Sequence, residues 1–170
     1  MLRRMWSKRL LIIYNHPNLI KHLIVAPILV ISTWSLGTFL GLNIGSNVYG
    51  SVPYKWFITL KRIGNLKYGQ YVIFQQTVNG TQGLLVKKII GVPGDQITID
   101  QNDCWVGDKY VGKAKKFSKE GRELYPMQIK VIPQKQYFVA GTSPDSFDSR
   151  YKEIGLIEES RILFRAFPLW

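Results

Sequence analysis

Two residues of this sequence, Ser51 and Lys87, stand in contexts that suit nucleophilic catalysis. Ser51 follows a glycine, which permits a tight backbone approach, and precedes Val52 and Pro53, where the proline stiffens the next turn. Such a segment can present a hydroxyl for attack on a carbonyl group. A serine hydroxyl is a weak nucleophile, so it needs a neighbouring base that takes its proton.

The pair Lys87-Lys88 supplies a candidate base. The pair lies within an apolar run, so an extended chain places one of the two lysines on the same face as Leu85 and Ile89. A water-exposed lysine has a pKa of about 10.4, but desolvation and neighbouring positive charge lower this value by several units and give a neutral amine near pH 7. In the alternative interpretation, both lysines extend to solvent from an edge strand.

One long apolar span precedes Ser51. Residues 23–42 carry no charge, and about 20 helical residues at ~1.5 Å each cover the ~30 Å hydrocarbon core of a bilayer. We therefore expect a transmembrane helix at 23–42. A cleavable signal peptide is one alternative, although its apolar region has about 7–15 residues and ends in small residues, which Leu42-Asn43-Ile44 does not provide. A buried helix of a soluble protein is the other, and the lack of an amphipathic period argues against it.

The charges before this span predict its orientation. Segment 1–22 contains no acidic residue and carries Arg3, Arg4, Lys8, Arg9 and Lys21. By the positive-inside rule, segment 1–22 is cytoplasmic and the domain 43–170 lies across the membrane. We therefore expect a single-pass protein of the bacterial inner membrane with a periplasmic domain.

The whole chain is strongly basic, with 23 Lys and Arg against 11 Asp and Glu and a formal net charge of +12. The charge is dispersed and no nucleic-acid recognition motif accompanies it, which favours membrane lipid over nucleic acid as a partner. The one dense cluster is interpreted as a solvated loop, with a binding patch as the alternative, and comprises Lys109, Lys113, Lys115, Lys116, Lys119 and Arg122. Cys104 is the only cysteine, and its strand-like surroundings favour a small buried residue over a nucleophile.

Residues 43–170 have the pattern of a mainly β domain. Short β-branched and aromatic runs bounded by turn-forming residues predict strands at 70–75, 84–92, 96–99, 128–132 and 137–140. The segment 103–112 predicts a hairpin that turns at Gly107-Asp108. The polar segment 113–127 predicts a surface loop or a short helix. The apolar segment 56–58 suits either a membrane interface or a packed core.

Three segments resemble motifs of the type I signal (leader) peptidases, in the order in which that family carries them. Residues 85–95, LVKKIIGVPGD, are similar to the lysine motif, a hydrophobic strand with a basic pair followed by Gly-x-Pro-Gly-Asp. Residues 141–151, GTSPDSFDSRY, are similar to the Ser-x-Asp-Ser-Arg box, and Ser51-Val52-Pro53 is similar to the Ser-Met-Pro segment. The resemblance covers most of residues 47 to 166.

This resemblance implies a signal-peptidase-like antiparallel β-domain in which Ser51 is the nucleophile and Lys87 is the base. It implies that Ser146 orients Lys87 by a hydrogen bond, and that Asp148 and Arg150 pair and brace the strand. In the alternative interpretation, Asp148 and Arg150 are a structural ion pair of a turn. The backbone N–H of Ser51 would form part of the oxyanion hole. The resemblance implies neither a metal nor a cofactor.

Within the family, the resemblance is greatest to the peptidases of conjugative transfer systems that mature pilin subunits. Their nucleophile segment has the form Asn-x-Thr-x-Ser-Met-Pro-x-Gly-x-Tyr, to which Asn47, Ser51 and Pro53 conform. Three positions depart from it: Tyr49, Val52 and Lys55 stand where that branch has Thr, Met and Gly. Because the threonine hydroxyl would help to bind the charged intermediate and the tyrosine phenol cannot reach in the same way, Tyr49 is expected to weaken the side-chain half of the oxyanion hole.

The sequence therefore predicts a membrane-anchored serine endopeptidase with a Ser–Lys pair that cleaves the leader or terminal segment of exported pilin-like precursors in conjugative transfer. The acyl group would pass to water or, in a cyclisation, to the precursor's own N-terminus. Two alternatives stay open. One is a general type I signal peptidase that acts on preproteins, and the other is an inactive membrane-anchored scaffold of the same fold.

Overall fold

The computed structural model describes residues 17–47, 50–61, 64–78 and 80–169 of the chain. The chain divides into two compact units, Met1–Leu40 and Gly41–Trp170. The two units are described separately below. The basic residues expected to set the orientation lie outside the described residues, with the exception of Lys21.

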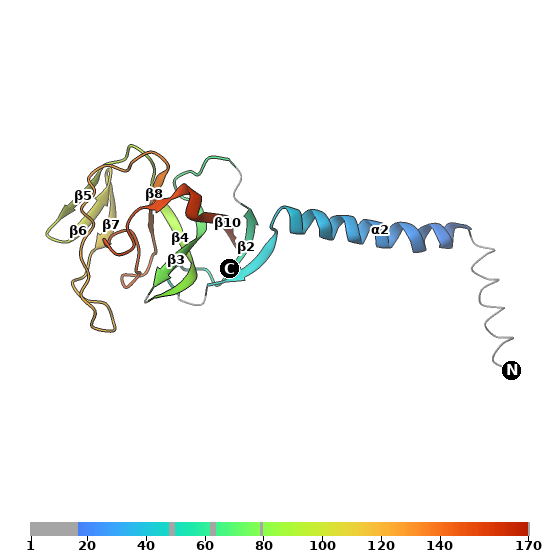
Figure 1. Ribbon diagram of the computed structural model, residues 1–170, viewed down its shortest axis with the longest axis horizontal. Coiled ribbons are helices and arrows are strands. Elements are labelled where there is room, and N and C mark those ends of the chain that lie inside the picture. The colour runs from blue at the N-terminus through green and yellow to red at the C-terminus, as the bar shows by residue number, and fades with distance from the viewer. Residues whose placement is uncertain (1–16, 48–49, 62–63, 79, 170) are drawn as a thin grey trace. The chain divides into compact units, whose positions relative to one another are not determined.

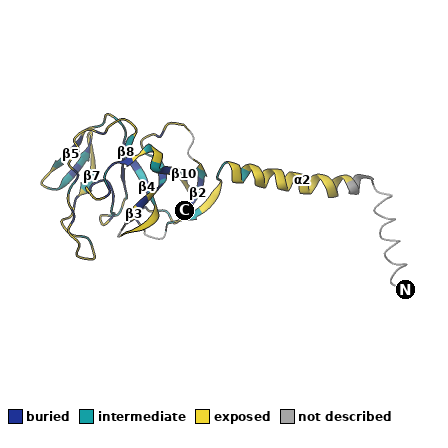
Figure 2. Cartoon of the chain, in the orientation of Figure 1, coloured by how far each residue is buried: buried dark blue, intermediate teal, exposed yellow. Residues whose placement is uncertain are grey.

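The first unit contains helix α2, Pro17–Phe39. Its part Lys21–Phe39 is the one helix in the described ranges that is long and apolar enough to cross a membrane, and none of it is buried (Figure 2). Leu40 N donates to Leu36 O in the last turn, and Gly41 then adopts a φ of 63°, a left-handed conformation that commonly terminates helices. The helix therefore ends before residue 42, where the expected span ends.

The second unit contains two antiparallel sheets (Figure 1). The seven-stranded sheet has the order β1-β2-β10-β3-β4-β8-β9, and the three-stranded sheet has the order β5-β6-β7. The strands of the larger sheet are β1 Asn43–Ser46, β2 Trp56–Lys61, β3 Tyr71–Val78, β4 Thr81–Gly91, β8 Gln136–Ala140, β9 Ile157–Glu158 and β10 Ile162–Pro168. The smaller sheet consists of β5 Ile97–Asp100, β6 Asp103–Val106 and β7 Lys109–Lys113. A 3-10 helix, η1 Glu159–Arg161, leads from β9 into β10.

Apolar side chains join the two sheets into one core. Ile97, Cys104 and Val106 of the smaller sheet pack in one cluster with Phe138 and Ala140 of β8. Gly91, at the end of β4, lies at this junction, where an added Cβ would approach Val106 to 2.7 Å and Ile132 to 2.5 Å. The smaller sheet is therefore held firmly against β4 and β8, the strands beside the candidate site.

The prediction of a mainly antiparallel β domain is confirmed. The strands expected at 70–75, 84–92, 96–99 and 137–140 correspond to β3, β4, β5 and β8, and the hairpin 103–112 corresponds to β6 and β7. The strand expected at 128–132 is wrong. This segment forms only an isolated bridge, Gln96↔Val131, because its hydrogen bonds go to the turn after β4 and to the start of β5. The segment 113–127 is a loop, as one of the two expectations had it, and contains no helix.

The pairing of β4 leaves part of one edge open. β4 pairs with β3 over residues 81–88, whereas its pairs with β8 involve Lys88, Ile89 and Gly91. Along 81–86, no other strand in the described part of the chain pairs with the edge of β4 that faces away from β3. This open edge leads directly to Lys87.

Candidate active site

Ser51 lies in a loop that Asn47 holds in shape. The Asn47 backbone N–H donates to Lys55 O at 2.8 Å, and its side-chain amide donates to Val52 O at 3.1 Å and to Tyr54 O at 3.3 Å. Val52 is buried in a cluster with Phe57, and Val86 of β4 packs against that cluster. These contacts hold the residue next to Ser51 against a cluster that includes Val86 of β4.

Lys87 is almost fully buried, with 2% of its surface exposed. It faces Val72 across the β3–β4 pair, and its Nζ donates to Ser146 Oγ at 2.8 Å. Lys88 lies on the other face of β4, half-buried, with its Nζ 5.8 Å from the centre of the Tyr71 ring. The burial of Lys87 excludes the alternative in which both lysines extend to solvent.

The loop 141–151 contributes a buried ion pair. The Arg150 guanidinium donates to both oxygens of Asp148, from Nε at 2.9 Å and from Nη2 at 3.0 Å. Nη2 also donates to the backbone oxygen of Ser146 at 3.0 Å. Asp148 and Arg150 are both buried, so this bidentate pair fixes the backbone on either side of the Ser146 hydroxyl.

Gly141 connects Ser51 to this network. Its N–H donates to Asp148 Oδ2 at 3.0 Å, and the next N–H, of Thr142, donates to Ser51 O at 2.9 Å. A Cβ on Gly141 would lie well under 3.0 Å from both Ser51 O and Ser146 Oγ, so only glycine fits here. The structure therefore brings the backbone of Ser51 together with Lys87, Ser146, Asp148 and Arg150.

The family described as "Signal peptidase, peptidase S26" matches residues 17–170 of the chain. The chain belongs to this family. The match includes helix α2 and every strand of both sheets.

Several curated signal peptidases are similar to this family member. Signal peptidase I T of Bacillus subtilis is 28% identical over 169 residues, which cover 93% of this chain and 80% of that protein. The probable signal peptidase I-2 of Synechocystis is 28% identical over 111 residues, 62% of this chain and 49% of that protein. Signal peptidase I of Bacillus amyloliquefaciens is 31% identical over 116 residues, 62% of this chain and 58% of that protein. The matches to the last two thus span about half of each relative.

A signal peptidase I structure from Enterococcus faecalis V583 is also similar, with a TM-score of 0.40 and 21% identity. The similarity covers 59% of this chain and 96% of that one.

In this signal peptidase family member, burial lowers the pKa of Lys87 from 10.5 to about 8. The Asp148 carboxylate favours the protonated amine and acts against this shift, whereas the Arg150 guanidinium adds to it. Because the Asp148–Arg150 pair is neutral as a whole, desolvation dominates. With a pKa of about 8, roughly a tenth of the amine is neutral at pH 7 and about half at pH 8.

The other candidate residues have simpler environments. Cys104 is fully buried in β6, and burial raises the pKa of its thiol to about 12, so it is a packing residue and not a nucleophile. Phe57 is buried in the core, whereas its neighbour Trp56 is half-exposed. Tyr49, the departure expected to weaken the oxyanion hole, lies outside the described residues.

Sequence reasoning missed the role of Gly141 in joining Ser51 to the Ser146 loop. Its only signal was its position at the head of the segment that resembles the Ser-x-Asp-Ser-Arg box. The contact that makes a side chain impossible comes from Ser51, distant in sequence, and no local pattern reports it.

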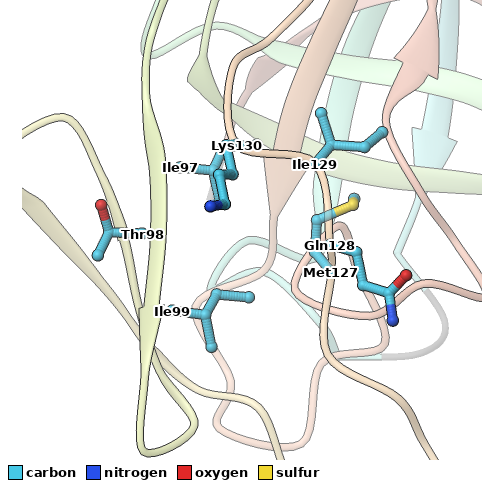
Figure 3. Close-up of a pocket in the computed structure, with 7 residues that line it drawn as sticks. All are labelled: Ile97, Thr98, Ile99, Met127, Gln128, Ile129 and Lys130. Atoms are coloured by element: carbon cyan, nitrogen blue, oxygen red, sulfur yellow. The ribbon is translucent and has the colours of Figure 1, made fainter.

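A cleft of about 400 Å³ lies elsewhere in this unit, between β5 and the segment 127–130 (Figure 3). Ile97 and Ile99 line one side, and Met127 and Ile129 line the other. None of its lining residues belongs to the group around Lys87. The candidate active site beside the open edge of β4 is therefore distinct from this cleft.

Proposed function

We propose that this protein is a membrane-anchored serine endopeptidase that cleaves the leader segments of exported precursors, with Ser51 as nucleophile and Lys87 as general base. The observation that carries the proposal is the environment of Lys87. Its amine is buried, has a pKa of about 8, and is held by Ser146 within the network that also holds the backbone of Ser51. A serine and a neutral lysine in such a setting suit acyl transfer.

In the proposed mechanism, neutral Lys87 takes the proton of the Ser51 hydroxyl as the oxygen attacks the scissile carbonyl carbon. The backbone N–H of Ser51 donates to the oxyanion that forms. The Lys87 ammonium then gives its proton to the leaving amine, the C–N bond breaks, and an ester to Ser51 remains. Water attacks this ester, Lys87 again takes the proton, and the acid product leaves with the serine hydroxyl restored.

Lys87 donates its hydrogen bond to Ser146 in the described structure, and no bond there joins its amine directly to the Ser51 hydroxyl. Catalytic hydrogen bonds are often long in free enzymes and shorten when substrate binds. Ser146 would hold the amine in place so that its lone pair can turn toward Ser51 once the proton is lost. We therefore assign Ser146 as the residue that orients Lys87, and Asp148 with Arg150 as the pair that fixes Ser146.

The open edge of β4 suits an extended substrate. The backbone groups along 81–86 can pair with an added peptide strand, and that strand would run toward Lys87 and Ser51. Val52, the residue after Ser51, is buried in an apolar cluster against which Val86 of β4 packs, so the surroundings of Ser51 are partly apolar. The family resemblance implies small residues such as alanine before the scissile bond.

Helix α2 would anchor this peptidase in the membrane. Segment 1–22, basic and without acid, would remain in the cytoplasm, and the β domain would lie in the periplasm. Precursors emerging from the bilayer would then meet Ser51 near the membrane surface. Glycosylation-site or cysteine-accessibility mapping on either side of 21–39 would test this topology directly.

A narrower hypothesis concerns the substrate. Asn47, one of the residues shared with the conjugative pilin-maturation branch, closes the loop that carries Ser51, which agrees with a motif that shapes this loop. Signal peptidase I proteins are among the relatives, so general preprotein cleavage is equally supported. We propose pilin-like precursors of a transfer system as the narrower substrate class, with hydrolysis or cyclisation as the outcome.

The test compares the small membrane proteins of cells that carry wild type or Ser51→Ala, by intact mass and N-terminal analysis. Accumulation of one precursor in the variant alone supports the pilin hypothesis, and accumulation of many precursors supports a general signal peptidase. A wild-type product lighter than the linear peptide by one water indicates cyclisation. Identical profiles under conditions that express the transfer system support the inactive scaffold instead.

A further inference from the structure

The outer side of Arg150 contacts the smaller sheet. While Nε and Nη2 face Asp148 and Ser146, the remaining nitrogen, Nη1, donates to the backbone oxygen of Lys113 at 3.1 Å. Lys113 is the last residue of β7. Because Arg150 is 2% exposed, this carbonyl replaces a water molecule that the guanidinium would otherwise need.

A β-bulge in β7 turns this carbonyl toward Arg150. Cys104 pairs with Gly112, but the next residue of β6, Trp105, pairs with Tyr110, so Val111 is the extra residue on β7. Gly112 has a φ of 122°, which strongly favours glycine. A bulge at this place bends the strand and re-aims the groups that follow it.

Gly112 also leaves space for the guanidinium. A Cβ at this position would lie 3.0 Å from Arg150 Nη1, tighter than nine in ten real contacts of a Cβ, so the guanidinium would have to shift by a few tenths of an ångström. A side chain here would push the guanidinium, which is held by Asp148 and Ser146 on its other side. Gly121, in the loop that follows β7, has a φ of 77° and nothing within 4 Å of an added Cβ.

We propose that the β7 bulge is a positioning element of the active site: Gly112 admits the Arg150 guanidinium, the Lys113 carbonyl holds it, and Arg150 in turn holds Ser146 against Lys87. This inference rests on the proposed function of Ser51 and Lys87. A displaced Arg150 would loosen its bond to Ser146 O and so the partner of the Lys87 amine. It would also weaken the repulsion that opposes protonation of Lys87, so the pKa of Lys87 would rise.

The contacts between the loop after β7 and Asp145 do not replace this support. Lys115 and Lys119 both pair with Asp145, and Lys119 does so at 3.0 Å. All three side chains are substantially exposed, and such pairs contribute little to rigidity. The contact at Gly112 and Lys113, in contrast, is made to a buried group.

The experiment uses full-length protein in detergent micelles and an internally quenched peptide with an apolar leader segment that ends in Ala-x-Ala. Gly112→Ala is compared with Gly121→Ala. Both variants replace a glycine of positive φ by alanine, but only the methyl group at position 112 would contact Arg150. We expect Gly112→Ala to lower kcat about tenfold or more, to leave KM within about twofold, and to shift the rising limb of the pH profile to higher pH. A tenfold loss of kcat corresponds to about 1.4 kcal/mol of activation free energy. Gly121→Ala should match wild type, and equal behaviour of the two variants would overturn the inference.

A double-mutant cycle with Arg150→Lys covers the case in which Gly112→Ala does not fold. Lysine has no Nη1 for the added methyl group to contact. Adding Gly112→Ala to Arg150→Lys should therefore lower the thermal unfolding temperature little further. Equal losses in both backgrounds would show that Gly112 does not act through Arg150. Lys87→Ala in the same assay separates the two proposals. If Lys87→Ala is active, the proposed function fails, and if it is inactive while Gly112→Ala behaves as Gly121→Ala, only this inference fails.

Discussion

Two neighbouring lysines, on opposite faces of strand β4, have different environments. On one face, Lys87 is surrounded by apolar residues and by the buried Asp148–Arg150 pair, and its pKa falls to about 8. On the other face, the next residue, Lys88, is half-exposed beside the Tyr71 ring. The comparison shows that burial, and not residue type, lowers the pKa of Lys87 in this strand.

The neighbours of each face explain the difference. Lys87 enters a region lined by the loop 141–151, where its hydrogen-bond partner among the described residues is a neutral hydroxyl, that of Ser146. A hydroxyl satisfies the amine without the full charge that would stabilise its protonated form. Lys88, on the other face, is only half-buried, and its Nζ lies 5.8 Å from the centre of the Tyr71 ring. Four predictions test this contrast.

The largest effect is expected for removal of the Lys87 amine. Lys87→Ala should lower kcat/KM by about 10³-fold or more, because no base remains to take the proton of Ser51. Far-UV circular dichroism and thermal unfolding should show a folded protein, since the variant removes a costly buried amine. Cleavage of a leader peptide by purified protein measures the loss, and near-normal turnover would remove Lys87 from the mechanism.

The second prediction concerns the pair that supports the Lys87 face. Asp148→Ala leaves the Arg150 guanidinium buried without its carboxylate and should lower the free energy of unfolding by about 3–5 kcal/mol. Chemical denaturation measures this loss. Asp145→Ala is the matched control, because it removes an acid from exposed pairs in the same loop and should leave the unfolding midpoint close to that of wild type. Equal effects would mean that burial does not distinguish the two acids.

The third prediction is the pH dependence that follows from the pKa of Lys87. The base is active when neutral, so kcat/KM should rise about tenfold per pH unit below the pKa and level off above about 8. The free energy of unfolding should also rise with pH. The folded state binds fewer protons than the unfolded state between about 8 and 10.5, so the stability contribution of Lys87 rises with pH through that window. A flat profile between pH 6 and 8 would contradict a titrating base.

The smallest effect is expected on the other face of β4. Lys88→Ala removes a half-exposed ammonium and its contact with the Tyr71 ring, worth about 0.5–1 kcal/mol at such a site. We expect kcat/KM within about fivefold of wild type and an unchanged pH profile. A loss comparable to that of Lys87→Ala would mean that the base has been assigned to the wrong lysine.

Much of the fold could be predicted from local pattern because its strands are short, alternating and bounded by turn residues. The hairpin 103–112 is an example, since Gly107-Asp108 and the flanking β-branched residues specify it locally. The strand expected at 128–132 fails because its backbone bonds are made with residues 94–97, and sequence alternation does not report such partners. β10 was missed because it is the central partner of β2 and β3, a long-range pairing that its own residues do not encode.

The candidate site could be predicted only in part, for a related reason. The resemblance placed Ser51, Lys87 and the loop 141–151 in one site, whereas the alternation of apolar residues left open whether either lysine would be buried. The supports of that site, Gly141 and the bulge at Gly112, act through contacts with residues far away in sequence. A glycine in a sequence does not tell which side chain occupies the space that it leaves.

The most direct test of the account is a titration of the Lys87 amine itself. Lysine Cε chemical shifts, measured by NMR from pH 6 to 11 on full-length Ser51→Ala protein, would be assigned to residue 87 by the signal that Lys87→Met removes. We predict a pKa near 8 for this signal. A Lys87 pKa near 10.5 would contradict the assignment, because fewer than about one amine in a thousand would then be neutral at pH 7.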